Sequence, residues 1–118
     1  MSRDPAYLLD ILIAARLILD YAKGLSLKAF RSDQLRQDAV MRRFEIIGEA
    51  TRRISDDYRT AHPEIPWGEM IGMRNRLIHE YDEANLSIVW GSVKRDIPEL
   101  IALIEPLVPP DEPDEDEQ

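Results

Sequence analysis

The stretch "VMRRFEIIGEATRRI", residues 40–54, carries apolar or small side chains at spacings of four, three, four and three residues. These positions are Val40, Phe44, Ile47, Thr51 and Ile54. The spacing places all five on one face of an α-helix and is typical of the seam between packed helices in a bundle. The pattern predicts a long helix that begins with Ser32 as its N-cap and runs to about Tyr58.

An amphipathic helix is also predicted before this stretch. Asp4 suits an N-cap, Pro5 suits the first helical position, and Gly24 suits the C-terminal end of a helix. The apolar stripe between these ends consists of Leu8, Ile11, Leu12, Ala15, Leu19 and Ala22. A first helix between Asp4 and Gly24 would pack this stripe against the seam of the second.

Two more helices are predicted after residue 58. The proline-containing loop "TAHPEIP" interrupts the chain, and a third helix is expected from near Trp67 to about Ile78. The segment "EYDEAN", residues 80–85, has the composition of a turn in which Asp82 or Asn85 could cap a fourth helix. That helix carries one apolar side, formed by Leu86, Val89, Trp90, Val93, Ile97, Leu100, Ile101 and Ile104. Pro98 lies inside it and should kink it or leave a nearby carbonyl unpaired.

These four helices predict an all-α fold, an antiparallel four-helix bundle formed by residues 1–108. Residues 109–118 are expected to be a disordered acidic tail, since the last eight residues, "DEPDEDEQ", contain six acids and no base. The formal net charge of the chain is −8, but residues 1–110 hold 17 acids against 15 bases. A nearly neutral helical part can still bind RNA if its arginines cluster, so the overall charge does not exclude nucleic acid.

Several classes of protein are excluded or disfavoured by composition. The chain has no cysteine, so it can form neither a disulfide nor a thiolate metal site. Its two histidines and the lack of a Glu-x-x-His pair on the third helix make a metal or other cofactor unexpected. "YLLDILIAARLIL" is too short and too charged to span a bilayer, and the N-terminus does not read as a signal peptide. A cytoplasmic location is therefore expected.

The third helix places an arginine in the middle of its apolar face. That face consists of Trp67, Met70, Ile71, Leu77 and Ile78, and Arg74 falls at its centre. A guanidinium in this position is unfavourable unless it is paired or lines a polar cleft. In a structural interpretation, Arg74 pairs with Glu45 or Glu49 of the second helix and His79 ends the third helix. In a functional interpretation, Arg74 binds a phosphate and His79 transfers a proton.

The segment "RNRLIHEY", residues 74–81, has the order arginine, four residues, histidine, one residue, tyrosine. This motif resembles the signature of HEPN-domain proteins of the HepT type, the toxins of toxin–antitoxin pairs whose partner is a minimal nucleotidyltransferase of the MntA type. Three segments carry the resemblance in order along the chain: residues 42–55, 65–82 and 88–105. Together they extend the similarity over most of residues 5–105.

The resemblance implies a homodimer that cleaves RNA, such as tRNA or mRNA, without a metal or other cofactor. Arg74 and His79 would be the catalytic residues, and Tyr81 would be the position that the partner nucleotidyltransferase modifies with AMP. A dimer would also bring two motifs to one cleft and place Arg74 at the subunit interface.

Other charged residues are weaker candidates. Asn75 and Arg76 lie next to Arg74 within the motif and could position RNA. The arginine pairs 42/43 and 52/53 are interleaved with acids, which favours a solvated surface over phosphate binding. His62 is expected in an exposed loop without a partner for ligand binding. Two further functions fit the same sequence: a non-catalytic helical subunit of a nucleotidyltransferase complex, and an RNA-binding module.

Overall fold

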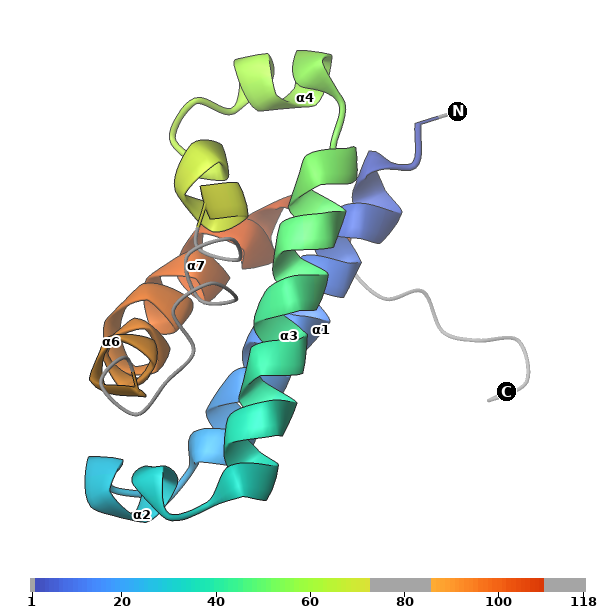
Figure 1. Ribbon diagram of the computed structural model, residues 1–118. Coiled ribbons are helices and arrows are strands. Elements are labelled where there is room, and N and C mark those ends of the chain that lie inside the picture. Colours follow the sequence, from blue (N-terminus) through green and yellow to red (C-terminus); the bar gives the residue numbers. More distant parts are fainter. Residues whose placement is uncertain (1, 73–85, 110–118) are drawn as a thin grey trace, which may run out of the picture.

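The computed structural model describes residues 2–72 and 86–109, and these residues form helices and turns with no strand (Figure 1). The elements are α1 (Asp4–Ala22), α2 (Leu27–Arg31), α3 (Gln34–Arg53), α4 (Asp56–Ala61), α6 (Leu86–Gly91), η2 (Ser92–Asp96), α7 (Ile97–Ile104) and η3 (Glu105–Leu107). Residues 67–72 are also helical. The prediction of an all-α fold is confirmed for this part of the chain. No helix within it is long and apolar enough to cross a membrane.

Helices α1 and α3 form the centre of the molecule and run antiparallel, with α7 packed against α1 (Figure 1). All five positions of the predicted seam in α3 are buried. In α1 the predicted stripe is buried except for Leu19, which is half-buried, while Ile18 and Ala14 are additionally buried. Gly24 follows α1 with a φ of +77°, the left-handed conformation that lets the chain leave the helix and turn towards α2.

The start of the central helix differs from the prediction. Ser32 does not cap it; Ser32 instead ends the short helix α2, which the sequence did not suggest. The N-cap of α3 is Asp33, whose carboxylate accepts a hydrogen bond from the amide of Arg36 at 3.0 Å. The buried side-chain amide of Gln37 then donates to the carbonyls of Phe30 and Arg31, at 2.9 and 3.0 Å. This satisfies the C-terminal carbonyls of α2 and holds it against α3.

The predicted helix to Tyr58 also ends earlier, at Arg53, and a separate helix α4 follows. Ser55 is the N-cap of α4, with its hydroxyl accepting from the amide of Tyr58 at 3.1 Å. The guanidinium of Arg59 donates to the carbonyls of Thr51 and Arg52, both at 2.8 Å. These bonds replace the intrahelical partners that the end of α3 lacks, so the break costs little hydrogen bonding.

Asp4 has a different role from the predicted one. The N-cap of α1 is Arg3, and Asp4 is the first residue of the helix. The carboxylate of Asp4 accepts hydrogen bonds from the amide of Ser55 at 2.9 Å and from its hydroxyl at 2.7 Å. These bonds, the side-chain bond above all, lower the pKa of Asp4 although burial acts in the opposite direction. Asp4 therefore fastens the beginning of α1 to the junction of α3 and α4.

The last predicted helix exists and contains a π-helical segment, η2, between α6 and α7. Pro98 has no amide proton to donate to the carbonyl four residues earlier, and η2 lies immediately before it. Within η2 the hydrogen bonding widens, so that the amide of Ile97 donates to the carbonyl of Ser92. The apolar side is buried as predicted, except that Trp90 and Ile101 are half-buried.

Candidate functional site

The helical residues 67–72 lead into the predicted motif, and Trp67 fixes where they begin. Its indole N–H donates to the carbonyl of His62 at 2.9 Å, and the same carbonyl accepts from the amide of Ile65 at 3.2 Å. The amide of Met70 then donates to the carbonyl of Pro66 at 3.0 Å, which is the first helical bond of this segment. Trp67 and Met70 are 8% and 4% exposed, so the predicted apolar face is confirmed for its first turn.

An aromatic cluster supports this turn. The rings of Tyr58 and His62 stack with their centroids 4.3 Å apart, and Tyr58 meets the edge of Trp67 at 6.2 Å. Burial raises the pKa of Tyr58, with a smaller contribution from the negative charge of Asp4. His62, predicted as an exposed loop residue, is half-buried. Its Nδ1 lies 3.2 Å from a carboxylate oxygen of Glu64. The cluster links α4 to the helix that precedes the motif.

All of the predicted site residues lie outside the described residues: Arg74, Asn75, Arg76, His79 and Tyr81. Their roles stay predictions, as does the suggestion that Asp82 or Asn85 caps the last helix. The described residues on either side of them are Gly72 and Leu86. The structure therefore describes the residues around Gly72 and around Leu86, on the two sides of the predicted motif.

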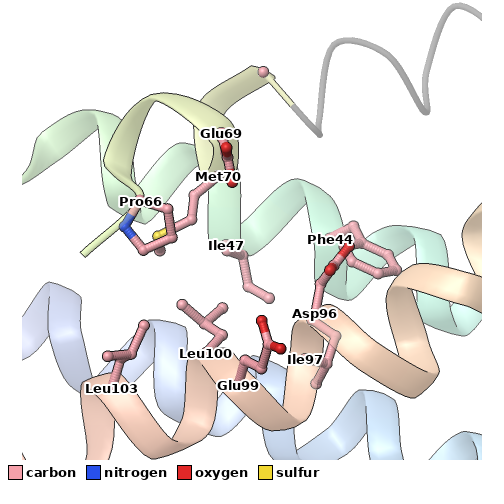
Figure 2. Close-up of a pocket in the computed structure, with 11 residues that line it drawn as sticks. Phe44, Ile47, Pro66, Glu69, Met70, Asp96, Ile97, Glu99, Leu100 and Leu103 are labelled. Carbon is pink, nitrogen blue, oxygen red and sulfur yellow. The ribbon is translucent and has the colours of Figure 1, made fainter. Parts of the chain in front are cut away.

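A groove of about 500 Å³ lies beside Gly72 (Figure 2). Four elements line it: α3 with Phe44 and Ile47, the 66–72 segment with Pro66, Glu69, Met70 and Gly72, η2 with Asp96, and α7 with Ile97, Glu99, Leu100 and Leu103. The apolar side chains of Met70, Ile47 and Leu100 point into it from three different elements, and the carboxylates of Asp96 and Glu99 lie on the side of η2 and α7 that faces it (Figure 2).

Among the described residues that line this groove, the charged groups are all acidic. Glu69, Asp96 and Glu99 are exposed, and none of them takes part in an ion pair among the described residues. Three carboxylates would repel a phosphate, so the groove suits an apolar or cationic group rather than the RNA backbone. Sequence reasoning missed it because its residues come from four separate elements, and no spacing within one helix reveals that they meet.

The structure also bears on the structural interpretation of Arg74. Glu45, one of its two suggested partners, forms an ion pair with Arg42 at 3.1 Å on the same helix. This pair agrees with a mixed-charge surface at the 42/43 arginines. Glu49 is exposed, and Arg43 is half-buried with its Nε shielded from solvent and without a hydrogen-bond partner within the described ranges.

Comparison with known proteins gives consistent matches. The family described as "Ribonuclease HepT-like" matches residues 11–107. A protein of Thermococcus cleftensis named "Probable ribonuclease HepT" is 44% identical over 101 residues, which cover 86% of this chain and 92% of the relative. Proteins of Methanocaldococcus jannaschii and Caldanaerobacter subterraneus, whose names describe candidate RNases, are 40% and 38% identical. These two alignments cover 80% and 85% of this chain and 87% and 89% of the relatives. No solved structure matches the chain.

Proposed function

The chain belongs to the HepT-like ribonuclease family, and we propose that it is a metal-independent endoribonuclease toxin of a type VII-like toxin–antitoxin system. The observation that carries the proposal is the family match over residues 11–107, which encloses the complete motif at residues 74–81. The anchoring of Trp67 and Met70 supports it, because a rigid first turn gives the following motif a fixed starting point.

The proposed reaction uses two side chains of the motif. His79 takes the proton from a ribose 2′-hydroxyl, whose oxygen attacks the adjacent phosphorus while the bond to the 5′-oxygen breaks. Arg74 binds the scissile phosphate and stabilises the negative charge that develops on its oxygens in the transition state. The reaction requires a 2′-hydroxyl and a strand free to adopt the in-line geometry, so single-stranded or loop RNA is the substrate.

The proposal includes a homodimer. A single motif contains one histidine, whereas cleavage needs a general base for the 2′-hydroxyl and a general acid for the leaving 5′-oxygen. Two chains facing each other across a cleft supply two Arg74–His79 sets, so that the second histidine can protonate the leaving group. Asn75 and Arg76 would help position the strand.

Regulation is proposed to act through Tyr81. A partner nucleotidyltransferase transfers the AMP group of ATP to its phenolic oxygen, with loss of the phenolic proton and release of pyrophosphate. This adds a negatively charged phosphate and a bulky nucleoside next to the motif. Both would oppose entry of an RNA strand, the phosphate by repulsion of like charges and the nucleoside by occupying space. The antitoxin would thus silence the enzyme without destroying it.

Induced expression without any partner tests the nuclease. Wild type, His79→Ala and Asp10→Ala are compared for growth, for total RNA integrity and for helical content of the purified chains. Asp10 is the control, since it is exposed on α1 and lies outside both the motif and the aromatic cluster. Growth arrest and RNA fragments are expected with wild type and Asp10→Ala and not with His79→Ala. Normal growth and intact RNA with folded wild-type protein would refute the nuclease and favour a non-catalytic subunit.

A further inference from the structure

Four exposed cations lie on α2 and η2, the two elements that contact α6 at the other flank of the predicted motif. We call Lys28, Arg31, Lys94 and Arg95 the basic ridge; all four are exposed. The elements that carry and adjoin it, α2, α6 and η2, contain one acid, Asp96. This region therefore has a positive net charge in a chain whose formal net charge is −8.

Contacts between α2 and α6 hold the ridge together. The ring of Phe30 lies against that of Trp90, with centroids 5.1 Å apart. Beside it the guanidinium of Arg31 donates to the hydroxyl of Ser87 on α6. The two short helices lie next to each other at the lower left of Figure 1. Arg31 is thus placed along α6 although it belongs to a different element.

The two cations of η2 are positioned along the same helix. The Nζ of Lys94 lies 4.9 Å from the ring centroid of Trp90, a distance at which the ring attracts the ammonium. The guanidinium of Arg95 lies against Gly91: a Cβ at that glycine would be 3.2 Å from its Nη2. Gly91 follows Ser87 by four residues, so Arg31 and Arg95 lie near neighbouring turns of α6.

The cations of the ridge have no acidic partner in the part of the chain that the structure describes. The ion pairs found there join Arg16 to Glu105, Arg36 to Asp33, Arg42 to Glu45 and His62 to Glu64. Like charges gathered without carboxylates repel one another, and binding of a polyanion would relieve that repulsion. Arginine is also well suited to phosphate, because its planar fork matches two phosphate oxygens.

Helix α6, which lies beside the ridge, follows the motif closely along the chain. Ser87 follows His79 by eight residues, and a chain of that length spans at most about 28 Å. An RNA strand cut at the motif must therefore pass within a short distance of α6. On this side it meets cations, whereas at Gly72 it would meet the carboxylates of the groove.

We propose that the basic ridge binds the sugar–phosphate backbone of single-stranded RNA next to the cleavage site. The inference rests on the proposed nuclease function and gives its substrate a docking surface. RNA is favoured over an acidic protein because protein interfaces have an apolar centre with few charges, and the described residues of this surface form no such centre. The one large exposed apolar side chain on α2, α6 and η2 is that of Ile88, 46% exposed.

The test measures RNA binding in the full chain carrying His79→Ala, so that the RNA stays intact. A fluorescent single-stranded RNA is titrated at several salt concentrations with the parent, with Arg31→Gln/Arg95→Gln and with the control Arg3→Gln/Arg16→Gln. The two pairs remove the same charge, and in each pair one arginine has a surface partner, Ser87 or Glu105. Lys28→Gln/Lys94→Gln is a second ridge variant that removes neither the Ser87 bond nor the packing on Gly91.

Loss of two phosphate contacts should reduce the slope of log K against log salt by about 1.4 and weaken binding at low salt by on the order of tenfold. Both ridge variants should show this, and the control should bind like the parent. Equal binding by ridge variants and parent, or equal weakening in ridge and control variants, would overturn the proposal. The first of these results would favour an acidic protein, instead of RNA, as the partner that binds the ridge.

Cleavage by the same variants with His79 intact separates this inference from the proposed function. If the ridge positions substrate, the ridge variants should raise KM several-fold with little change in kcat. Unchanged KM in folded ridge variants would overturn the ridge and leave the nuclease standing. If the wild-type chain cuts no RNA but the ridge variants lose RNA binding selectively, the ridge is supported and the nuclease is refuted.

Discussion

Replacing Asp4 by asparagine should destabilise the fold at neutral pH, because it removes the charged carboxylate that accepts the hydrogen bonds from Ser55. Asp4 is 7% exposed, and its carboxylate accepts two hydrogen bonds from Ser55, at 2.9 and 2.7 Å. Hydrogen bonds to a charged group contribute roughly 1.5–3 kcal/mol. A carboxylate in the first turn of α1 adds about 0.3–1 kcal/mol through the helix dipole. Because the asparagine can keep part of the bonding, we expect a loss of about 2 kcal/mol.

The loss should depend on pH in a defined direction. The bonds from Ser55 lower the pKa of Asp4 in the folded state. The charged carboxylate therefore stabilises the fold above its unfolded-state pKa, roughly 4, and this contribution disappears as the pH falls through the lower folded-state value. The difference between wild type and Asp4→Asn should be full at pH 7 and should shrink between about pH 5 and pH 2.

Urea denaturation followed by circular dichroism measures this difference at each pH. Asp10→Asn is the matched control, because Asp10 lies on the same helix and is exposed; its substitution should change stability by less than about 0.5 kcal/mol. Equal stability of wild type and Asp4→Asn at pH 7, or a difference that does not narrow in acid, would refute the role assigned to Asp4.

Three further outcomes are expected. Trp67→Phe removes the indole donor to the His62 carbonyl and should lower stability by about 1–2 kcal/mol and reduce RNA cleavage; unchanged denaturation would contradict the anchoring role. Ile47→Ala, at a buried position lining the groove, should cost about 2–4 kcal/mol in urea denaturation. Tyr81→Phe should remain toxic when the partner nucleotidyltransferase is co-expressed, and mass spectrometry should find AMP on wild type alone; neutralisation of the variant would exclude Tyr81.

Helix identity and burial were readable from the sequence because each depends on residues within one helix. The seam from Val40 to Ile54 repeats at helical spacing, and one buried face follows from that repeat. Pro98 similarly predicts an irregular stretch in the last helix, since it has no amide proton for the helical hydrogen bond. The π-helical segment before it is one way to accommodate the loss of that bond.

Helix ends were less predictable, because long-range bonds decide them. Ser32 and Asp33 are both good caps by composition, and the choice between them depends on Gln37 bonding to the end of α2. The break after Arg53 is held by hydrogen bonds from Ser55 to Asp4, which lies 51 residues before Ser55 in the chain. A sequence pattern contains no signal for such a partner. The groove and the basic ridge could not be predicted for the same reason: their residues come from different elements, and no pattern within one element shows that they meet.

The two flanks of the motif differ in charge, and this difference determines the side from which RNA would approach the motif. At Gly72 the groove has an apolar lining with exposed carboxylates, while at Leu86 the chain enters a helix beside the basic ridge. A phosphate backbone is repelled from the first surface and attracted to the second. On the proposed function, the RNA strand therefore reaches the motif from the side of α6. The groove stays free for an apolar or cationic contact, and such a contact would not compete with the substrate.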